Sequence, residues 1–171
     1  MKPTLLSIVI PIFNEHTILN ELLERSLSTG EQTGYPFELI LVNDASTDET
    51  PLILKEFQND PRIRPVHLRT NHGQFRATQE GLRHARGDWI VVLDGDLQDP
   101  PETVIDLVAK LESTADPGTI IFAVKKARTE KVWFKIGNGL YQTLLRWMAP
   151  ELPQNAGSYC LMPYHISQRV A

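Results

Sequence analysis

The sequence contains very little cysteine. Cys160 is the only cysteine in 171 residues, so the chain forms no internal disulfide and no site that needs several thiolates. A single thiol is typical of a reducing compartment, and we expect Cys160 to pack in the core as a small residue. The five histidines show no spacing typical of metal ligands.

Long apolar runs are missing as well. The first fifteen residues, MKPTLLSIVIPIFNE, contain a short apolar stretch that ends at Pro11, too short for the core of a signal peptide. No run elsewhere approaches the roughly 20 residues that a transmembrane helix needs. We therefore expect a cytoplasmic location, with the chain soluble or peripheral at the cytoplasmic membrane.

A surplus of positive charge is also absent. The formal net charge is −4, which gives no basis for nucleic-acid binding. With 42% hydrophobic and 22% charged residues, the composition is that of an ordinary globular protein. We expect residues 1–171 to form a single domain. Because the chain stops shortly after Tyr164, inside what reads as a new helix, we also expect a C-terminal truncation that removes further segments, membrane anchors among them.

Short apolar runs alternate with segments of helical periodicity. The runs 5–10, 37–42, 63–68, 89–93 and 119–124 predict strands, and helices are predicted at 16–28, 46–58, 74–86 and from 99 onward. Ser46 and Glu49 form a predicted capping box, while Asp99 is a predicted N-cap with Glu102 reaching back. This alternation predicts an α/β fold with a mostly parallel central sheet and helices on both faces.

Polar clusters follow three of the predicted strands. They are PIFNE at 11–15, NDAS at 43–46 and DGD at 94–96. The carboxyl ends of parallel strands lie at one edge of a sheet, where α/β proteins bind their ligands. We therefore expect the three clusters to converge on one site.

The D-G-D cluster suggests a cation site. Two aspartates separated by one small residue can direct oxygen ligands toward one Mg²⁺ or Mn²⁺, an ion that is often shared with substrate phosphates. An ordinary turn after a strand is the alternative for this pattern alone. An EF-hand is excluded, because positions six and twelve of the loop are Asp99 and Ile105. The absence of G-x-G-x-x-G after the first strand disfavours a dinucleotide-binding oxidoreductase.

Four segments occur in the order and spacing of a known family. They are SIVIPIFNE (7–15), ILVNDASTDET (40–50), NHGQFRATQEGLRHARGDWIVVLDGDLQDPPE (71–102) and IIFAVKKAR (120–128). The chain resembles the inverting family 2 glycosyltransferases of the GT-A fold, and within them the dolichyl-phosphate and undecaprenyl-phosphate sugar synthases. The resemblance covers nearly the whole chain. It implies an enzyme that moves a sugar from a nucleotide-sugar donor to a polyprenyl phosphate, with Mg²⁺ or Mn²⁺ as cofactor.

The resemblance also implies roles for individual residues. The nucleotide-binding set consists of Pro11, Phe13, Glu15, Asp44, Asn71, Gly73 and Asp94. The metal-binding set consists of Asp94, Asp96 and Gln98, with Asp94 and Asp96 also expected to be catalytic. From the residues alone other interpretations stay open: a core aromatic for Phe13, a first-turn helix acid for Glu15, and an ordinary turn for Asn71 and Gly73.

Residues 125–148 bear on the acceptor. In the resembled group a V-x-G-x-R-x-x-R-like motif binds the lipid phosphate, and this chain keeps Arg128 but has Lys125 for the first arginine and Ala123 for the glycine. Lysine keeps the charge without the bidentate geometry of arginine. The helix-like segment that follows mixes aromatic and basic residues, which predicts either a helix at a membrane surface or an ordinary core-packing helix.

Three functions remain open at this point. Transfer to a polyprenyl phosphate needs no general base, because a phosphate monoester is already ionised at neutral pH. Transfer to a hydroxyl of a polysaccharide or cell-surface glycan needs one, and residues 125–171 hold no convincing equivalent of the acidic pair that many such relatives carry. A non-catalytic nucleotide-binding module is the third, because Asn155 and Cys160 stand where the family has aspartate and arginine.

Overall fold

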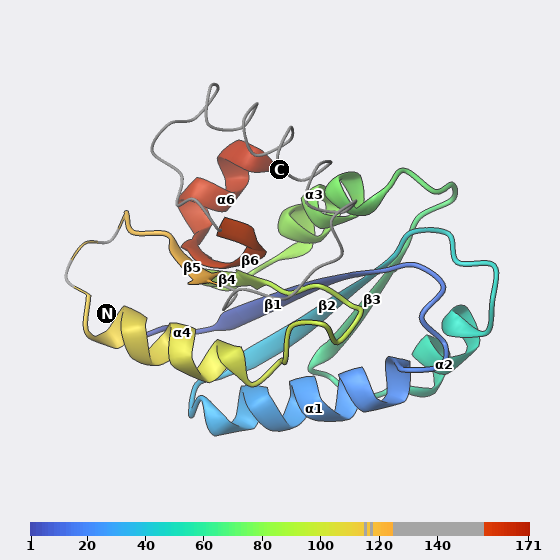
Figure 1. Cartoon of the computed structure of the whole chain (residues 1–171), viewed down its shortest axis with the longest axis horizontal. Coiled ribbons are helices and arrows are strands. Elements are labelled where there is room, and N and C mark those ends of the chain that lie inside the picture. The colour runs from blue at the N-terminus through green and yellow to red at the C-terminus, as the bar shows by residue number, and fades with distance from the viewer. Residues whose placement is uncertain (115, 117, 125–155) are drawn as a thin grey trace, which may run out of the picture.

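A six-stranded sheet forms the centre of the computed structural model, which describes residues 1–114, 116, 118–124 and 156–171 (Figure 1). The strands are β1 (Leu6–Ile12), β2 (Phe37–Asn43), β3 (Ile63–His67), β4 (Trp89–Val92), β5 (Ile121–Val124) and β6 (Ala156–Pro163). Their order in the sheet is β3-β2-β1-β4-β6-β5. Strands β1 to β4 are parallel to one another, and β6 is antiparallel to both β4 and β5. The predicted α/β class with a mostly parallel sheet is confirmed.

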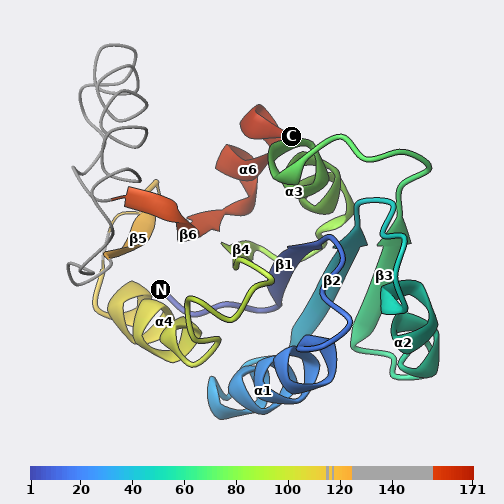
Figure 2. The same cartoon turned by 45° about the vertical axis from the view of Figure 1, so that its right-hand side comes forward.

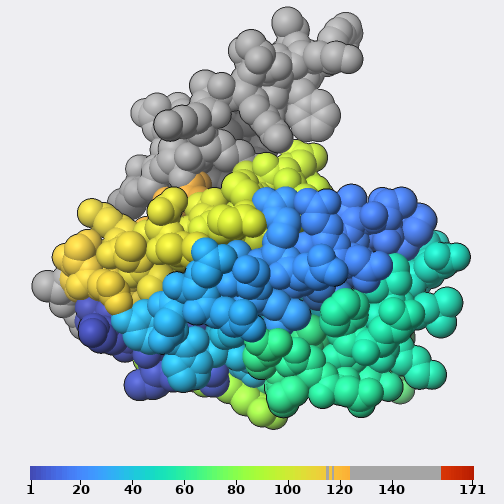
Figure 3. Space-filling model, turned by 90° about the horizontal axis from the view of Figure 1, so that it is seen from below, coloured from blue at the N-terminus to red at the C-terminus, as the bar shows by residue number. Residues whose placement is uncertain are grey.

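Helices cover both faces of this sheet, as predicted. They are α1 (Leu19–Gln32), α2 (Thr50–Glu56), α3 (Gln74–His84), α4 (Thr103–Glu112) and α6 (Tyr164–Val170). Helices α1, α2 and α4 lie on one face, and α3 and α6 lie on the other (Figures 1 and 2). Seen from below, α4 in yellow, α1 in blue and α2 in green cover the first face side by side (Figure 3).

The central strand β1 is buried on both faces. Ile8 and Ile10 pack with the helices of the first face, whereas Val9 packs with α3 on the other, and all three are fully buried. This two-sided burial explains why β1 reads as a continuous apolar run. Gly81 brings α3 close to the sheet, because a Cβ at this position would lie 2.3 Å from Val9 Cγ1. The start of α3 is thereby held near the ends of β1 and β2.

Helix α2 begins later than predicted. It starts at Thr50 rather than Ser46, so the predicted capping box is wrong. Ser46 Oγ instead accepts a hydrogen bond from the backbone N–H of Asn14 at 2.9 Å. Asp48 Oδ1 accepts the backbone N–H of Thr50 at 3.0 Å. The loop before α2 is therefore shaped by its contact with the loop after β1 rather than by helix capping.

Helix α4 also begins later than predicted. It starts at Thr103, with Glu102 rather than Asp99 at the N-cap position and no side-chain capping bond. The Glu102 carboxylate instead accepts two hydrogen bonds from Arg25 of α1, at 2.9 and 2.8 Å. Glu102, which was predicted to reach back to the start of the helix, therefore joins α4 to α1 instead.

Some predictions fall on parts of the chain that the structure does not describe. Lys125, Arg128, Asn155 and the helix-like segment up to 148 lie outside the described residues. Within the described ranges, no helix combines the length and the apolar character needed to cross a bilayer. Cys160 on β6 is buried, as expected. Burial, together with the nearby charge of Asp94, raises the pKa of its thiol to about 12.

Candidate functional site

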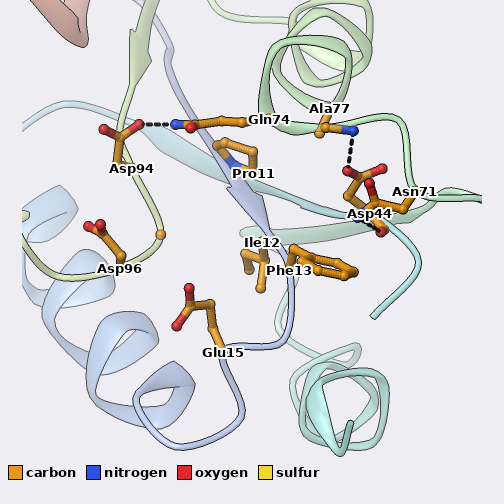
Figure 4. A pocket seen from close by; sticks show the side chains of 12 residues that line it. Pro11, Ile12, Phe13, Glu15, Asp44, Asn71, Gln74, Ala77, Asp94 and Asp96 are labelled. Carbon is orange, nitrogen blue, oxygen red and sulfur yellow. Dashed lines mark hydrogen bonds between the residues drawn. The ribbon is translucent and has the colours of Figure 1, made fainter. Parts of the chain in front are cut away.

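A cavity of about 400 Å³ opens at the carboxyl ends of β1, β2 and β4 (Figure 4). Strand order reverses here, because β2 and β4 follow β1 along the chain yet flank it on opposite sides. Such a reversal point is where open α/β sheets bind ligands. The predicted residues that line the cavity are Pro11, Phe13, Glu15, Asp44, Asn71, Gly73, Asp94 and Asp96. The three polar clusters of the sequence therefore converge, as predicted.

The D-G-D segment lies directly against β1. A Cβ on Gly95 would come within 2.6 Å of the carbonyl oxygen of Pro11, so only glycine allows this approach. The segment then turns, with the backbone N–H of Gln98 donating to Asp96 Oδ1 at 2.9 Å. Gln98 does not line the cavity, unlike Asp94 and Asp96. Its predicted role as a metal ligand receives no support from this placement.

Asp44 anchors the loop that precedes α3. Only 2% of this residue is exposed, and its two carboxylate oxygens accept the backbone N–H groups of His72 at 2.8 Å and Gly73 at 2.7 Å. The side-chain amide of Asn71 donates to the Asp44 carbonyl at 3.3 Å. Asp44 thus fixes the predicted N-x-G turn, a contact that the sequence did not indicate.

Three residues beside the cavity adopt a left-handed backbone. Asn14, Ala45 and Leu97 have φ values of 56°, 56° and 55°, and they directly follow Phe13, Asp44 and Asp96 of the cavity wall. A non-glycine residue in this region costs about 1 kcal/mol or more, and such strain is concentrated at functional sites. The repetition at three strand ends indicates that the direction of the wall side chains is fixed by the fold.

The loops after β1 and β2 are bound to each other beside the cavity. Thr47 N–H donates to Asn14 Oδ1 at 2.8 Å, and Asp48 Oδ2 lies 2.8 Å from the His16 ring. Burial alone would raise the pKa of Asp48, but hydrogen bonds from Thr50 and His16 outweigh it and lower that pKa to about 2. These contacts hold the two loops as one unit.

Gln74, the first residue of α3, also lines the cavity and was missed by the sequence analysis. Its side-chain amide donates to Asp94 Oδ1 at 2.6 Å (Figure 4). Its position in the sequence could have predicted this place, because Gln74 directly follows the N-x-G turn and begins a helix that faces the ligand edge.

Negative charge dominates the cavity. Glu15, Asp44, Asp94 and Asp96 contribute four carboxylates, and none of the described residues that line the cavity is basic. Burial raises the pKa of Glu15, and the charges of Asp96 and then Asp48 raise it further. Within the described residues, no group of three or more His, Cys, Asp or Glu side chains is placed to hold a metal ion. A cation in this cavity would therefore take further ligands from substrate or water.

Burial of the Glu15 carboxylate and its repulsion by Asp96 and Asp48 predict that Glu15→Gln raises stability at neutral pH. The Glu15 pKa is raised in the folded state above its ordinary value of 4.5, so its ionisation disfavours the fold once the pH exceeds both values. The substitution removes that penalty. As the pH falls below 4.5 the glutamate becomes protonated in both states, and the gain should shrink toward zero.

Thermal unfolding at pH 7 and pH 4, without divalent cations, measures this difference. Glu24→Gln, on the exposed surface of α1, is the matched control. An equal gain at both pH values would contradict the electrostatic explanation.

Residues 7–170 match the family model described as glycosyl transferase family 2. The chain belongs to this family. Over 159 residues it is 33% identical to an uncharacterized glycosyltransferase of Bacillus subtilis (strain 168), covering 91% of this chain and 48% of that protein. Over 131 residues it is 39% identical to an undecaprenyl-phosphate 4-deoxy-4-formamido-L-arabinose transferase of Enterobacter sp. (strain 638), covering 75% and 39%. This family 2 chain thus spans less than half the length of these curated relatives.

Solved structures of glycosyltransferases share the fold. The mannosyltransferase of Pyrobaculum calidifontis, in complex with GDP-Man and Mn²⁺, has a TM-score of 0.68 at 23% identity, covering 100% of this chain and 47% of that one. TarS of S. aureus, in complex with UDP-GlcNAc, has a TM-score of 0.57 at 27% identity, covering 77% and 37%. The family 2 chain therefore has the GT-A fold that its sequence predicted.

Proposed function

We propose that this chain is the donor-binding part of a metal-dependent, inverting glycosyltransferase that moves a sugar from a nucleotide donor to a polyprenyl phosphate. The observation that carries the proposal is the acidic cavity at the ends of β1, β2 and β4. Its described wall holds four carboxylates and no basic side chain, so a diphosphate binds there much more tightly together with a cation that offsets the repulsion. A nucleotide sugar with a divalent ion satisfies this requirement.

The residues present fit Mg²⁺ or Mn²⁺. Asp96 and Asp94 would hold the ion, because both are hard oxygen ligands that line the cavity. When bound, the ion would neutralise the charge that develops on the leaving diphosphate. The sequence-based assignment of Gln98 as a third ligand stays a prediction.

The other end of the cavity suits the nucleoside. Phe13 is 44% exposed although it is a large aromatic side chain, and it offers an apolar surface for a base beside Pro11. Both oxygens of Asp44 already accept N–H groups from the turn before α3. Asp44 therefore supports nucleotide binding mainly by fixing Asn71 and Gly73.

Inversion follows from a single in-line displacement. An acceptor oxygen forms a bond to the anomeric carbon while the bond from that carbon to the diphosphate oxygen breaks, and the diphosphate leaves with the electron pair. A polyprenyl phosphate enters already ionised, so the step needs no general base. The undecaprenyl-phosphate transferase among the relatives supports this acceptor class. We propose that Lys125 and Arg128 hold the acceptor phosphate, with the protein peripheral at the cytoplasmic membrane.

A nucleotide panel tests donor binding. UDP, GDP, CDP and dTDP are each added with and without Mn²⁺, and the melting temperature is recorded. At 100 times its dissociation constant, the correct diphosphate should add about 2.7 kcal/mol, a shift of roughly 5–10 °C at this chain length. The shift should be much larger with Mn²⁺ than without it, with EDTA and Mn²⁺ alone as controls. A shift of the same size without Mn²⁺, or none with any nucleotide, would contradict the proposal.

Product analysis tests the acceptor. The full-length protein is incubated with a radiolabelled donor, Mn²⁺ and either undecaprenyl phosphate or a polysaccharide. The proposal expects label in a lipid-extractable phosphosugar. Label in polysaccharide instead would identify a hydroxyl as the acceptor and overturn the polyprenyl phosphate assignment.

A further inference from the structure

The side chain of Gln74 reaches across the cavity from α3 to the end of β4. Its Nε2 donates to Asp94 Oδ1 at 2.6 Å, and the two residues lie 20 positions apart in the sequence (Figure 4). A hydrogen bond to one oxygen fixes the rotation of the Asp94 carboxylate about its terminal bond. Asp94 belongs to the D-G-D segment, so this amide sets the orientation of a candidate cation ligand.

The same helix start is anchored to the end of β2. Gly73 N–H donates to Asp44 Oδ2 at 2.7 Å, and Gly73 directly precedes Gln74. Two consecutive residues therefore connect the carboxylate at the end of β2 with the carboxylate at the end of β4. A displacement of the turn before α3 changes the position of Asp94 through Gln74.

We propose that Gln74 is a positioning residue that couples nucleotide binding to cation binding. The inference rests on the proposed function, in which the nucleoside lies toward Asp44 and the cation toward Asp94. A carboxylate that is already oriented loses less conformational freedom when it binds a cation. A nucleotide that orders the turn before α3 therefore raises the affinity for the cation. Thermodynamic linkage requires the cation to raise the affinity for the nucleotide by the same factor.

A neutral amide is chemically suited to this role. It donates a hydrogen bond to Asp94 and leaves the charge of that carboxylate intact for a cation. A lysine or arginine at this position would form an ion pair with Asp94 and compete with the cation. A glutamate would repel Asp94 and lack a donor at neutral pH.

The test measures nucleotide affinity with and without Mn²⁺ by calorimetry, using UDP, GDP, CDP and dTDP on the wild type, Gln74→Ala and Gln74→Glu. We expect the gain in affinity from Mn²⁺ to fall by about tenfold in Gln74→Ala, within the usual range of coupling energies, and by more in Gln74→Glu. The melting temperature of free Gln74→Ala should stay near wild type, because Gln74 is an exposed residue.

Gln79→Ala is the matched control. Gln79 lies on the same helix, and its amide donates to the Val170 carbonyl at 2.6 Å, away from the cavity wall. This variant should keep the full gain from Mn²⁺. If Gln74→Ala also keeps the full gain, or loses affinity equally with and without Mn²⁺, the coupling role is overturned. If the wild type gains nothing from Mn²⁺ with any nucleotide, the proposed function fails first and the coupling role with it.

Discussion

Replacing Asp96 with asparagine is expected to abolish Mn²⁺-dependent nucleotide binding and to reduce sugar transfer by roughly a hundredfold or more. Asp96 is exposed in the cavity, and its charge contributes to the raised pKa of Glu15. Asparagine keeps the oxygen that accepts the N–H of Gln98 but removes the charge that attracts a cation. Stability without ligand should therefore stay the same or rise, because one source of repulsion is gone.

Two measurements check the Asp96 prediction. The melting temperature is recorded with and without the nucleotide and Mn²⁺, and turnover of the donor is measured in the full-length protein. Asp106→Asn is the control, since Asp106 is an exposed acidic residue in the first turn of α4 and lies outside the cavity wall. A variant Asp96→Asn that still gains stability from Mn²⁺ with nucleotide would show that the ion binds elsewhere.

Replacing Asp44 with asparagine is expected to destabilise the fold by about 3 kcal/mol. The Asp44 carboxylate is almost fully buried and accepts two backbone N–H groups, one on each oxygen. An asparagine offers one oxygen and turns an NH₂ group toward the second N–H, which leaves a partly buried donor unpaired. Hydrogen bonds to a charged group contribute about 1.5–3 kcal/mol each, and an unpaired buried donor adds to the loss.

Urea unfolding of Asp44→Asn beside Asp96→Asn provides the comparison. Both variants lose one carboxylate at the end of a central strand, yet only the Asp44 variant should lose stability, which thermal unfolding should show as a fall in melting temperature of about 6–12 °C. The m-values should match, which would place the change in the folded state. Equal stability of the two variants would show that the turn before α3 does not depend on Asp44.

The strands were predictable because a strand that is buried on both faces appears in the sequence as a short, continuous apolar run. The predicted run 37–42 corresponds to β2 at Phe37–Asn43, and the run 89–93 to β4 at Trp89–Val92. Parallel pairing of these strands then placed Asp44 and Asp94 at one edge. Fold class and the convergence of the acidic clusters therefore followed from short apolar runs and the polar residues that end them.

Contacts between distant loops were not predictable from local patterns. The capping box at Ser46 was wrong because Ser46 bonds to Asn14, 32 residues earlier. The side-chain bond from Gln74 to Asp94 likewise depends on how closely α3 packs on the sheet, which Gly81 permits. Local propensity is the same for a serine that caps a helix and one that binds a neighbouring loop, so only the tertiary structure decides between them.

The antiparallel direction of β6 determines the edge of the sheet at which the segment between β5 and β6 is attached. Because β6 is antiparallel to β4 and to β5, β5 ends and β6 begins at the edge that carries the cavity, where Val124 pairs with Ala156. Both attachment points of residues 125–155 therefore lie at the same edge of the sheet as the cavity rather than at the opposite edge. A change in the length of this segment would therefore be accommodated at that edge, without interrupting the parallel strands β1, β2 and β4 whose ends form the cavity.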